Sequence, residues 1–383
     1  MKILIIANGY PDRRSPQWGC FEKDQALALK AMGHDVTMMY VDRRFRTYWR
    51  KIGITKKKTE QGLYVYGMFY LPMGWLYNKV LYKLLQKIVM WLFDKLYQVY
   101  VKEQEKPDII YAHFIWNISF ASVLKRKYGI PIVGLEHWSE LNNEHLSLIA
   151  QYWGRLGYQN SDKLLVVSQS LQEQIRKHFS LNTTVVYNMV GEEFLNLPPS
   201  PKRNDGIIRL VSTGSLIHRK GFDVLINALS IIGELKTSWE VLIIGEGSEH
   251  DNLVEQIKNL HLENKVKLVG RKDKKEIIEI LHQCDAFVLA SRAENFSVAV
   301  LEALSAGLPV VATICGGIRE CIHKENGLLV PVDDVSSLAN ALIQVINDNC
   351  SFNRESIAEE CRRRFSPHVI ASQLTEIFEE VTH

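Results

Sequence analysis

The chain of 383 residues is too long for one ordinary hydrophobic core, and its 46% apolar and 23% charged residues are typical of a soluble globular protein with two domains. Its six cysteines are scattered without a CxxC pair, which excludes a disulfide framework or a zinc site and suits a reducing cytosol, and no apolar stretch reaches the ~20 residues that cross a bilayer. The net charge of +3 hides an asymmetry, because the first 198 residues hold 26 basic and 17 acidic side chains and the rest hold 20 and 26, which suggests an anionic partner for the first half.

The N-terminal pattern predicts a strand, a helix and a second strand. The short apolar run at 2–7 indicates a buried strand and not a signal peptide. A polar loop at 8–19 leads to a helix at 21–32, and a strand follows at 35–41. On its residues alone, the loop is a long βα connection. It lacks GxGxxG, so the dinucleotide fingerprint of an oxidoreductase is absent.

Basic and aromatic residues are concentrated in two segments of the first half. Residues 43–58 hold eight basic side chains interleaved with aromatic ones and no acid. Residues 75–101 are strongly apolar with lysines mostly one or two helical turns apart, which predicts an amphipathic helical region. This composition is typical of segments that bind anionic bilayer surfaces. The alternative is a solvated loop followed by a helix that faces the core.

Further strands are predicted at 108–113, 130–135, 163–168 and 184–187, which complete the first sheet. The second of them is followed by the sequence Glu-His-Trp-Ser-Glu at 136–140. Two carboxyl groups around an imidazole at the end of a strand can serve as acid–base groups. They can equally be part of a loop held by hydrogen bonds.

The proline-rich, polar stretch 197–206 predicts the boundary between the domains, which we place so that residues 1–198 form the first domain and 199–365 the second. The second domain opens with a strand at 208–213 and a loop that contains Arg219-Lys220. Two adjacent cations in a βα loop suit a diphosphate, because charge-assisted bonds to phosphate are strong. The alternative is a solvated helix start.

A strand–helix–strand unit organises the second domain. Strands at 286–290 and 310–312 flank a short helix at 297–306. The loop before this helix lies at the carboxyl end of a parallel strand, where ligands bind, and a helix N-terminus attracts phosphate. Glu294 in the loop and Glu302 on the helix can accept sugar hydroxyls. The alternative is an ordinary βαβ unit with two solvated glutamates.

The string Glu294-Asn-Phe-Ser-Val-Ala-Val-Leu-Glu302, followed by Ala-x-x-x-Gly-x-Pro-Val-Val-Ala, resembles the signature of glycosyltransferase family 4 (group 1), retaining enzymes of the GT-B fold. The resemblance covers nearly the whole chain and is strongest over 208–330. It implies an α/β protein of two doubly wound Rossmann-like domains that face a central cleft, in agreement with the strand–helix alternation on both sides of the boundary. It also implies that a C-terminal helix, 366–383, crosses back to the N-terminal domain.

The resemblance implies a catalytic role for four residues. Glu294 would contact the donor sugar, and His137 would approach the sugar and the acceptor. Lys220 matches the family lysine at the diphosphate, but Ser215 stands where the family has arginine. Arg219 is therefore expected to supply that charge and to stabilise the diphosphate as the sugar bond breaks.

A second set of residues is expected to bind the nucleotide part of the donor, with the carboxylate of Glu302 on the ribose and the backbone of 296–298 on the diphosphate. The expected donor-binding residues are Gly19, Ser215, Gly245, Arg271, Phe296, Ser297, Val298 and Glu302. Many family members have glycine where this chain has Asn295 and Ser297, and the larger side chains would alter the donor-sugar pocket.

Together with these features, the resemblance implies a retaining glycosyltransferase of the hexosyltransferase type that uses a nucleotide-diphosphate sugar. No metal or other cofactor is expected, because the cations are protein-borne. The expected acceptor is a lipid-linked saccharide in capsule, lipopolysaccharide or exopolysaccharide synthesis. The protein is expected to be cytoplasmic and peripheral on the inner face of the cell membrane, with residues 43–58 and 75–101 on an anionic surface and no nucleic-acid partner.

Three alternatives stay open. Nucleotide-sugar epimerases and phosphorylases share the fold, and they differ by using no acceptor or free phosphate. A non-catalytic partner subunit would keep the fold without the site, and Ser215 favours this alternative, whereas Lys220 and both glutamates oppose it. An oxidoreductase is opposed by the missing glycine fingerprint.

Overall fold

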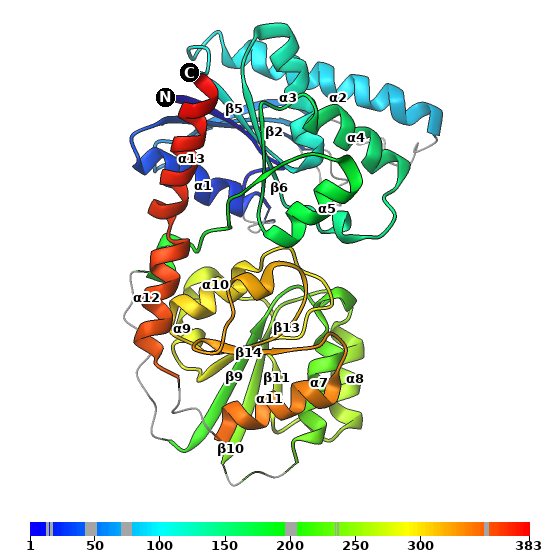
Figure 1. Ribbon diagram of the computed structural model, residues 1–383, viewed down its shortest axis with the longest axis vertical. Coiled ribbons are helices and arrows are strands. Elements are labelled where there is room, and N and C mark those ends of the chain that lie inside the picture. The colour runs from blue at the N-terminus through cyan, green and yellow to red at the C-terminus, as the bar shows by residue number, and fades with distance from the viewer. Residues whose placement is uncertain are drawn as a thin grey trace. The chain divides into compact units, whose positions relative to one another are not determined.

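The computed structural model describes residues 1–383 except 13–14, 16–17, 43–51, 70–78, 196–204, 234, 236 and 348–351, and for 79–85 it describes the backbone alone. The chain divides into two compact units (Figure 1). The first comprises Met1–Val167, Gln172–Val186 and Ile370–His383, and the second comprises Ser168–Leu171 and Tyr187–Val369.

The first unit contains an eight-stranded sheet in the order β3-β4-β2-β1-β5-β6-β7-β8. Its strands are β1 (Lys2–Ile6), β2 (Asp35–Asp42), β3 (Gly53–Lys58), β4 (Tyr64–Phe69), β5 (Ile109–His113), β6 (Ile132–Glu136), β7 (Lys163–Val166) and β8 (Thr184–Val185). Neighbouring strands are parallel except β3, which forms an antiparallel hairpin with β4. The strand order switches between β1 and β5, and ligands bind at the carboxyl ends of strands at such a point.

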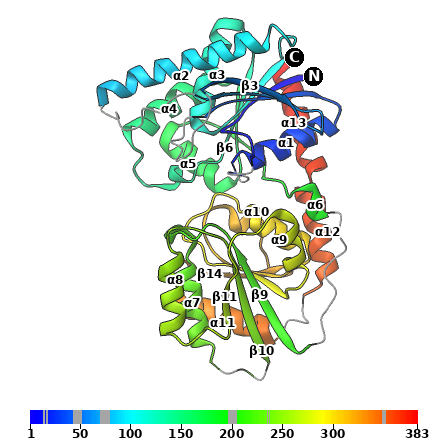
Figure 2. The ribbon, with the colours of Figure 1, turned by 180° about the vertical axis from the view of Figure 1, so that it is seen from behind.

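Helices cover both faces of this sheet, and α3 lies between α2 and α4 (Figure 2). The helices of the unit are α1 (Cys20–Ala31), α2 (Lys79–Tyr100), α3 (Phe114–Tyr128), α4 (Leu148–Tyr158) and most of α5 (Gln169–Phe179) and α13 (Pro367–Thr382). Buried aromatic rings join the three neighbouring helices, because Phe120 of α3 stacks on Phe93 at 5.0 Å and meets Trp153 edge-on at 5.1 Å.

The second unit contains a six-stranded, wholly parallel sheet in the order β11-β10-β9-β12-β13-β14, with the switch point between β9 and β12. Its strands are β9 (Ile207–Thr213), β10 (Ser238–Ile244), β11 (Val266–Leu268), β12 (Ala286–Leu289), β13 (Val310–Thr313) and β14 (Gly327–Val330). Its helices are α6 (Glu192–Leu195), α7 (Phe222–Ile231), α8 (His250–Asn259), α9 (Lys274–Leu281), α10 (Val298–Ser305), α11 (Val335–Asn347) and α12 (Arg354–Phe365). The central strand β12 is a continuous apolar run that is buried throughout, as expected for a strand covered on both faces.

Both units are parallel α/β sheets, as predicted, but the hairpin β3–β4 was not. Lys56, Lys57 and Lys58 lie on the edge strand β3, where charged residues are common and the alternating pattern of a strand is lost. The basic segment 43–51, Trp75 and the stretch 196–204 lie outside the described residues, so the boundary at 198 stays a prediction. None of the described helices is long and apolar enough to cross a membrane.

Candidate active site

The loop between β9 and α7, called here the cation loop (residues 214–221), carries the two predicted cations. It ends in a 3₁₀ turn over His218–Lys220. Gly221 follows with a φ of 65°, and a Cβ there would lie 2.0 Å from the carbonyl oxygen of Ala290. Glycine alone combines this backbone with so close an approach, so the cation loop is held against the end of β12.

The loop between β12 and α10, called here the Glu294 loop (residues 290–297), is fixed from two sides. Ser291 donates a hydrogen bond from Oγ to Oε1 of Glu294 over 2.8 Å. Gly316 has a φ of 52°, and a Cβ there would lie 1.7 Å from the carbonyl oxygen of Glu294. The N–H of Gly317 donates to the carbonyl of Asn295 over 2.9 Å. The chain after β13 therefore supports the Glu294 loop.

Lys220 and Glu294 meet at the switch point. Nζ of Lys220 lies 2.5 Å from Oε1 of Glu294, and the two side chains are 16% and 8% exposed. Arg219 lies nearer to solvent, 39% exposed, with Nη1 3.9 Å from Oε2 of Glu294 and 3.0 Å from the carbonyl oxygen of Ala293. Two of the four residues predicted to be catalytic, Arg219 and Lys220, thus lie beside the carboxylate of a third, Glu294.

The predicted phosphate-binding backbone, residues 296–298, forms the start of α10. Phe296 is buried and stacks on Tyr187 at 4.9 Å, and its carbonyl accepts a hydrogen bond from Nδ2 of Asn188 over 2.9 Å. Ser297 is the N-cap, but its hydroxyl is not used to cap the helix. Because the first N–H groups of a helix lack intrahelical partners, this turn presents donors at the positive end of the helix dipole.

Other predicted donor residues lie on loops at the same edge of the sheet. Gly245 has a φ of 155°, a Cβ there would lie 1.8 Å from a carbonyl oxygen of the cation loop, and its N–H donates to the carbonyl of Gly270 over 3.0 Å. Arg271 and Ser215 are exposed. Glu302, in the second turn of α10, is partly buried.

In the first unit, His137 lies beside a second histidine that the sequence did not single out. Nε2 of His137 is 3.2 Å from Nδ1 of His113, with the ring planes 10° apart. Burial holds the pKa of His113 well below its usual value, and the neighbouring His137 adds to this shift. The His113 imidazole is therefore neutral. The next residue, Phe114, has a φ of 67°, which is uncommon for a residue with a side chain.

Glu136 fixes the backbone around His137. Its Oε1 accepts the N–H groups of His137 and Trp138, each over 2.7 Å, and its Oε2 accepts the hydroxyl of Tyr158 over 2.5 Å. Burial raises the pKa of Glu136, although these hydrogen bonds oppose the shift. Glu136 therefore holds the loop, and the role of His137 stays a prediction.

Gly19 closes the loop after β1. It is the N-cap of α1 with a φ of 78°, and a Cβ there would lie 2.2 Å from the carbonyl oxygen of Gly9. Trp18 covers Gly9 and donates from its indole to the carbonyl of Asn8 over 2.9 Å. Glycine at position 19 thus allows the loop to fold back on itself at the switch point of the first sheet.

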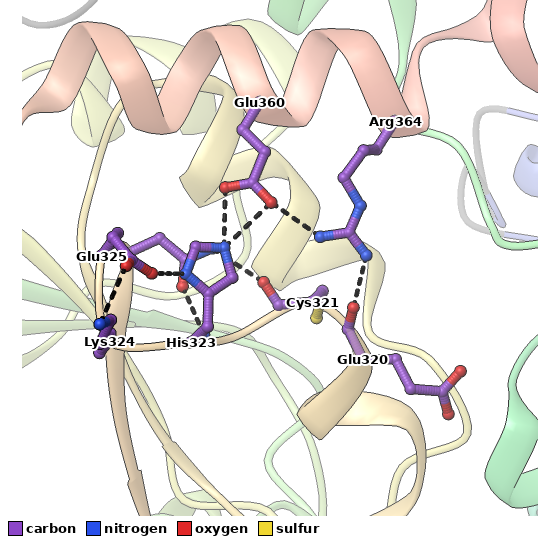
Figure 3. A network of polar contacts seen from close by, with 8 residues as sticks. Glu320, Cys321, His323, Lys324, Glu325, Glu360 and Arg364 are labelled. Atoms are coloured by element: carbon purple, nitrogen blue, oxygen red, sulfur yellow. Dashed lines mark hydrogen bonds and ion pairs between the residues drawn. The ribbon is translucent and has the colours of Figure 1, made fainter.

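A polar network without a sequence signal supports the chain after β13 (Figure 3). His323 pairs through Nδ1 with Glu325 over 2.7 Å and through Nε2 with Glu360 of α12 over 2.8 Å. Arg364 binds Glu360 over 2.8 Å and donates to the carbonyl of Glu320 over 2.6 Å. These contacts tie α12 to the 3₁₀ turn at Gly316–Glu320, which packs on the Glu294 loop.

Comparison with known proteins adds an independent line of evidence. Residues 23–194 match the family model described as Glycosyltransferase Family 4, and residues 195–364 match that of Glycosyl transferases group 1. N-acetyl-alpha-D-glucosaminyl L-malate synthase of Bacillus anthracis is 29% identical over 298 residues, covering 73% of this chain and 77% of that protein. TuaC of Bacillus subtilis, named for teichuronic acid biosynthesis, is 26% identical over 364 residues, covering 89% and 88%. Anabaena HepE in complex with UDP and glucose has a TM-score of 0.75 at 21% identity, covering 99% and 100%.

Proposed function

The chain belongs to the group 1 glycosyltransferases with the GT-B fold, and on this premise we propose that it moves a sugar from a nucleotide-diphosphate sugar to an acceptor hydroxyl with retention of the anomeric configuration. The observation that carries the proposal is the convergence of Arg219, Lys220 and Glu294 at the switch point of the second sheet. Two cations and a carboxylate beside a helix N-terminus suit a diphosphate attached to a sugar.

Each residue has a role in the proposed reaction. Arg219 and Lys220 bind the diphosphate, and their charge stabilises the negative charge that grows on the leaving group. Glu302 binds the ribose hydroxyls, and Glu294 contacts hydroxyls of the transferred sugar. His137 approaches the sugar and the acceptor, as the family resemblance implies. No metal is proposed, because protein cations supply the charge.

The proposed reaction needs no reactant beyond the donor and the acceptor. The bond between the anomeric carbon and the phosphate oxygen breaks, and the acceptor oxygen bonds to the anomeric carbon on the same face. The acceptor proton passes to the departing phosphate oxygen. The products are a glycoside and a nucleoside diphosphate, so the fixed cations act on the atoms that gain charge.

The proposed acceptor is a lipid-linked saccharide in cell-surface polysaccharide synthesis, at the inner face of the membrane. Similarity to TuaC supports the polysaccharide class. Lys87, Trp91 and Lys95 of α2 are exposed at intervals of four residues, and Nζ of Lys95 lies 5.8 Å from the Trp91 ring. A basic-aromatic ridge of this kind suits the interface of an anionic bilayer.

Vesicle co-sedimentation tests the membrane contact. The triple variant Lys87→Ser, Trp91→Ser, Lys95→Ser should bind vesicles containing anionic phosphatidylglycerol at least roughly tenfold more weakly, since each lysine near such a surface is worth about 1 kcal/mol. The control variant Lys258→Ser, Lys324→Ser removes two exposed lysines of the second unit and should bind as the wild type does. Equal binding by all three proteins would refute membrane contact through α2.

Product analysis tests the reaction itself. The enzyme is incubated with the nucleotide sugar that binds it and with a synthetic lipid-linked saccharide, and proton NMR identifies the new anomeric centre. Retention supports the proposal, and inversion contradicts it. Change of the nucleotide sugar without acceptor would identify an epimerase, and use of free phosphate would identify a phosphorylase. Binding without any turnover would favour a non-catalytic subunit.

A further inference from the structure

Arg292 lies two residues before Glu294 and joins three loops at the carboxyl edge of the second sheet. Its side chain is 19% exposed. Nη1 and Nη2 lie 2.8 and 2.7 Å from the two carboxylate oxygens of Asp223, in the first turn of α7. Nε lies 2.8 Å from Oδ1 of Asp333, between β14 and α11. Its charge is therefore balanced by two carboxylates.

The same residue connects the cation loop to the Glu294 loop. Nη1 of Arg292 also donates to the carbonyl of His218 over 2.6 Å, and the N–H of Arg292 donates to the carbonyl of Arg219 over 2.8 Å. In the opposite direction, Nη1 of Arg219 donates to the carbonyl of Ala293 over 3.0 Å. The loops that carry the two halves of the central ion pair are thus hydrogen-bonded in both directions.

The contacts require arginine and not merely a positive charge. A guanidinium offers five N–H donors in a fixed plane, whereas an ammonium offers three donors at one point and cannot reach all of these acceptors at once. Burial alone would raise the pKa of Asp223, but the hydrogen bonds and the charge of Arg292, together with a backbone hydrogen bond and His218, lower that pKa overall. Asp333 has a φ of 58°, a sparsely populated backbone conformation that is kept where surrounding contacts hold it.

We propose that Arg292 is a positioning residue for donor binding: it holds the cation loop against the Glu294 loop so that Lys220, Arg219 and Glu294 face one nucleotide-diphosphate sugar. This inference rests on the proposed function. Loss of the guanidinium fork would let the two loops separate and would leave two carboxylates uncompensated near the diphosphate. A lysine at this position keeps the charge and loses the fork, so it isolates the contribution of geometry.

Arg354 provides a matched control within the same unit. Its side chain is 15% exposed, and Nη2 lies 3.0 Å from Oδ1 of Asp285 and 3.2 Å from the Asp285 carbonyl. Asp285 directly precedes β12, whereas Arg292 follows it, so the two arginines lie at opposite ends of one strand. Arg292→Lys and Arg354→Lys therefore change two arginines of similar exposure, one beside the proposed donor site and one away from it, although Asp223 is 40% exposed and Asp285 only 6%.

Isothermal titration calorimetry with UDP, GDP, ADP and CDP first identifies the nucleotide that binds the wild type most tightly, and that nucleotide is the probe. Arg292→Lys should raise its dissociation constant roughly tenfold or more, equivalent to about 1.4 kcal/mol. Arg354→Lys should leave it within about twofold. Urea unfolding should show a loss of stability in both variants, at least as large in Arg354→Lys because Asp285 is the more buried partner. Asp333→Asn, which keeps the shape and removes one anchor, should raise the dissociation constant by a smaller factor.

Three results would contradict the inference, and each points to a different cause. Wild-type affinity in Arg292→Lys and Asp333→Asn, with lowered stability, would make Arg292 a structural residue only. An equal loss of affinity in Arg354→Lys would show that general destabilisation causes the effect. A wild type that binds none of the four nucleotides would overturn the proposed function and this inference with it, so the two failures are told apart.

Discussion

Lys220 and Glu294, 74 positions apart in the chain, form an ion pair in which Nζ lies 2.5 Å from Oε1. Removal of charges from water is costly unless each charge has a partner, and this pair compensates a lysine and a glutamate at the switch point where a parallel sheet binds its ligands. The ion pair fixes the position of the Lys220 ammonium before any donor binds. A donor diphosphate would then share Lys220 with Glu294.

Substitution of either partner should damage stability and transfer together. In the part of the chain that the structure describes, Lys220→Met leaves the Glu294 carboxylate with Arg219, at 3.9 Å, as its one paired cation, and we expect a loss of about 1–3 kcal/mol in the free energy of unfolding. Transfer should fall by roughly two to three orders of magnitude, as when one electrostatic group of a transition-state site is removed. Urea unfolding and kcat measure the two effects. The double variant Lys220→Met, Glu294→Gln should regain stability but no activity, and regained activity would contradict the assigned roles.

Glu302→Ala should weaken donor binding more than it slows the bound donor. A carboxylate that accepts two ribose hydroxyls contributes about 1.5–3 kcal/mol for each hydrogen bond, so the KM for the donor should rise by at least roughly tenfold with a smaller change in kcat. Steady-state kinetics at a series of donor concentrations separates the effect on KM from the effect on kcat. Glu255→Ala, an exposed residue of α8, serves as the control and should behave as the wild type does. A kcat effect without a KM effect would remove Glu302 from the ribose.

Gly316→Ala should be far more damaging than an ordinary glycine substitution. Its Cβ would lie 1.7 Å from the carbonyl oxygen of Glu294, and its φ of 52° is strained for alanine, so we expect a loss of about 2–4 kcal/mol and displacement of the Glu294 loop. Gly233 has a similar φ of 67°, with its nearest neighbouring atom 3.9 Å away, so Gly233→Ala should cost only about 1 kcal/mol. Thermal unfolding of both variants checks this difference, and equal losses would contradict the close approach.

His113 should make the protein less stable in acid. Its folded-state pKa lies well below the unfolded value of 6.5, so the unfolded chain binds a proton that the folded chain excludes. The stabilising contribution is complete above pH 6.5 and is lost as the pH falls below it, by up to about 1.4 kcal/mol per pH unit. In His113→Phe, the free energy of unfolding should depend less steeply on pH between 6.5 and 5. Chemical denaturation at a series of pH values tests this, and an unchanged slope would show that other groups govern the acid response.

The sequence was most informative where one short segment determined both local structure and chemistry. The apolar run before Glu294, the N-cap Ser297 and Gly307 predicted the strand, loop and helix at nearly their observed bounds. The edge strand β3 was missed because an exposed lysine run resembles a loop. Contacts between distant positions, such as His113 with His137 or Arg292 with Asp333, had no local signal, because they depend on which loops the strand order brings together.

A thermal-shift screen against UDP-, GDP-, ADP- and CDP-sugars, with Lys220→Ala beside the wild type, tests the proposed donor site most directly. A ligand at about 100 times its dissociation constant adds roughly 2.7 kcal/mol, which at this size is a shift of several degrees. The account predicts such a shift for the wild type with one nucleotide class and its loss in Lys220→Ala. An absence of any shift in the wild type, or an undiminished shift in the variant, would contradict a donor site centred on Lys220 and Glu294.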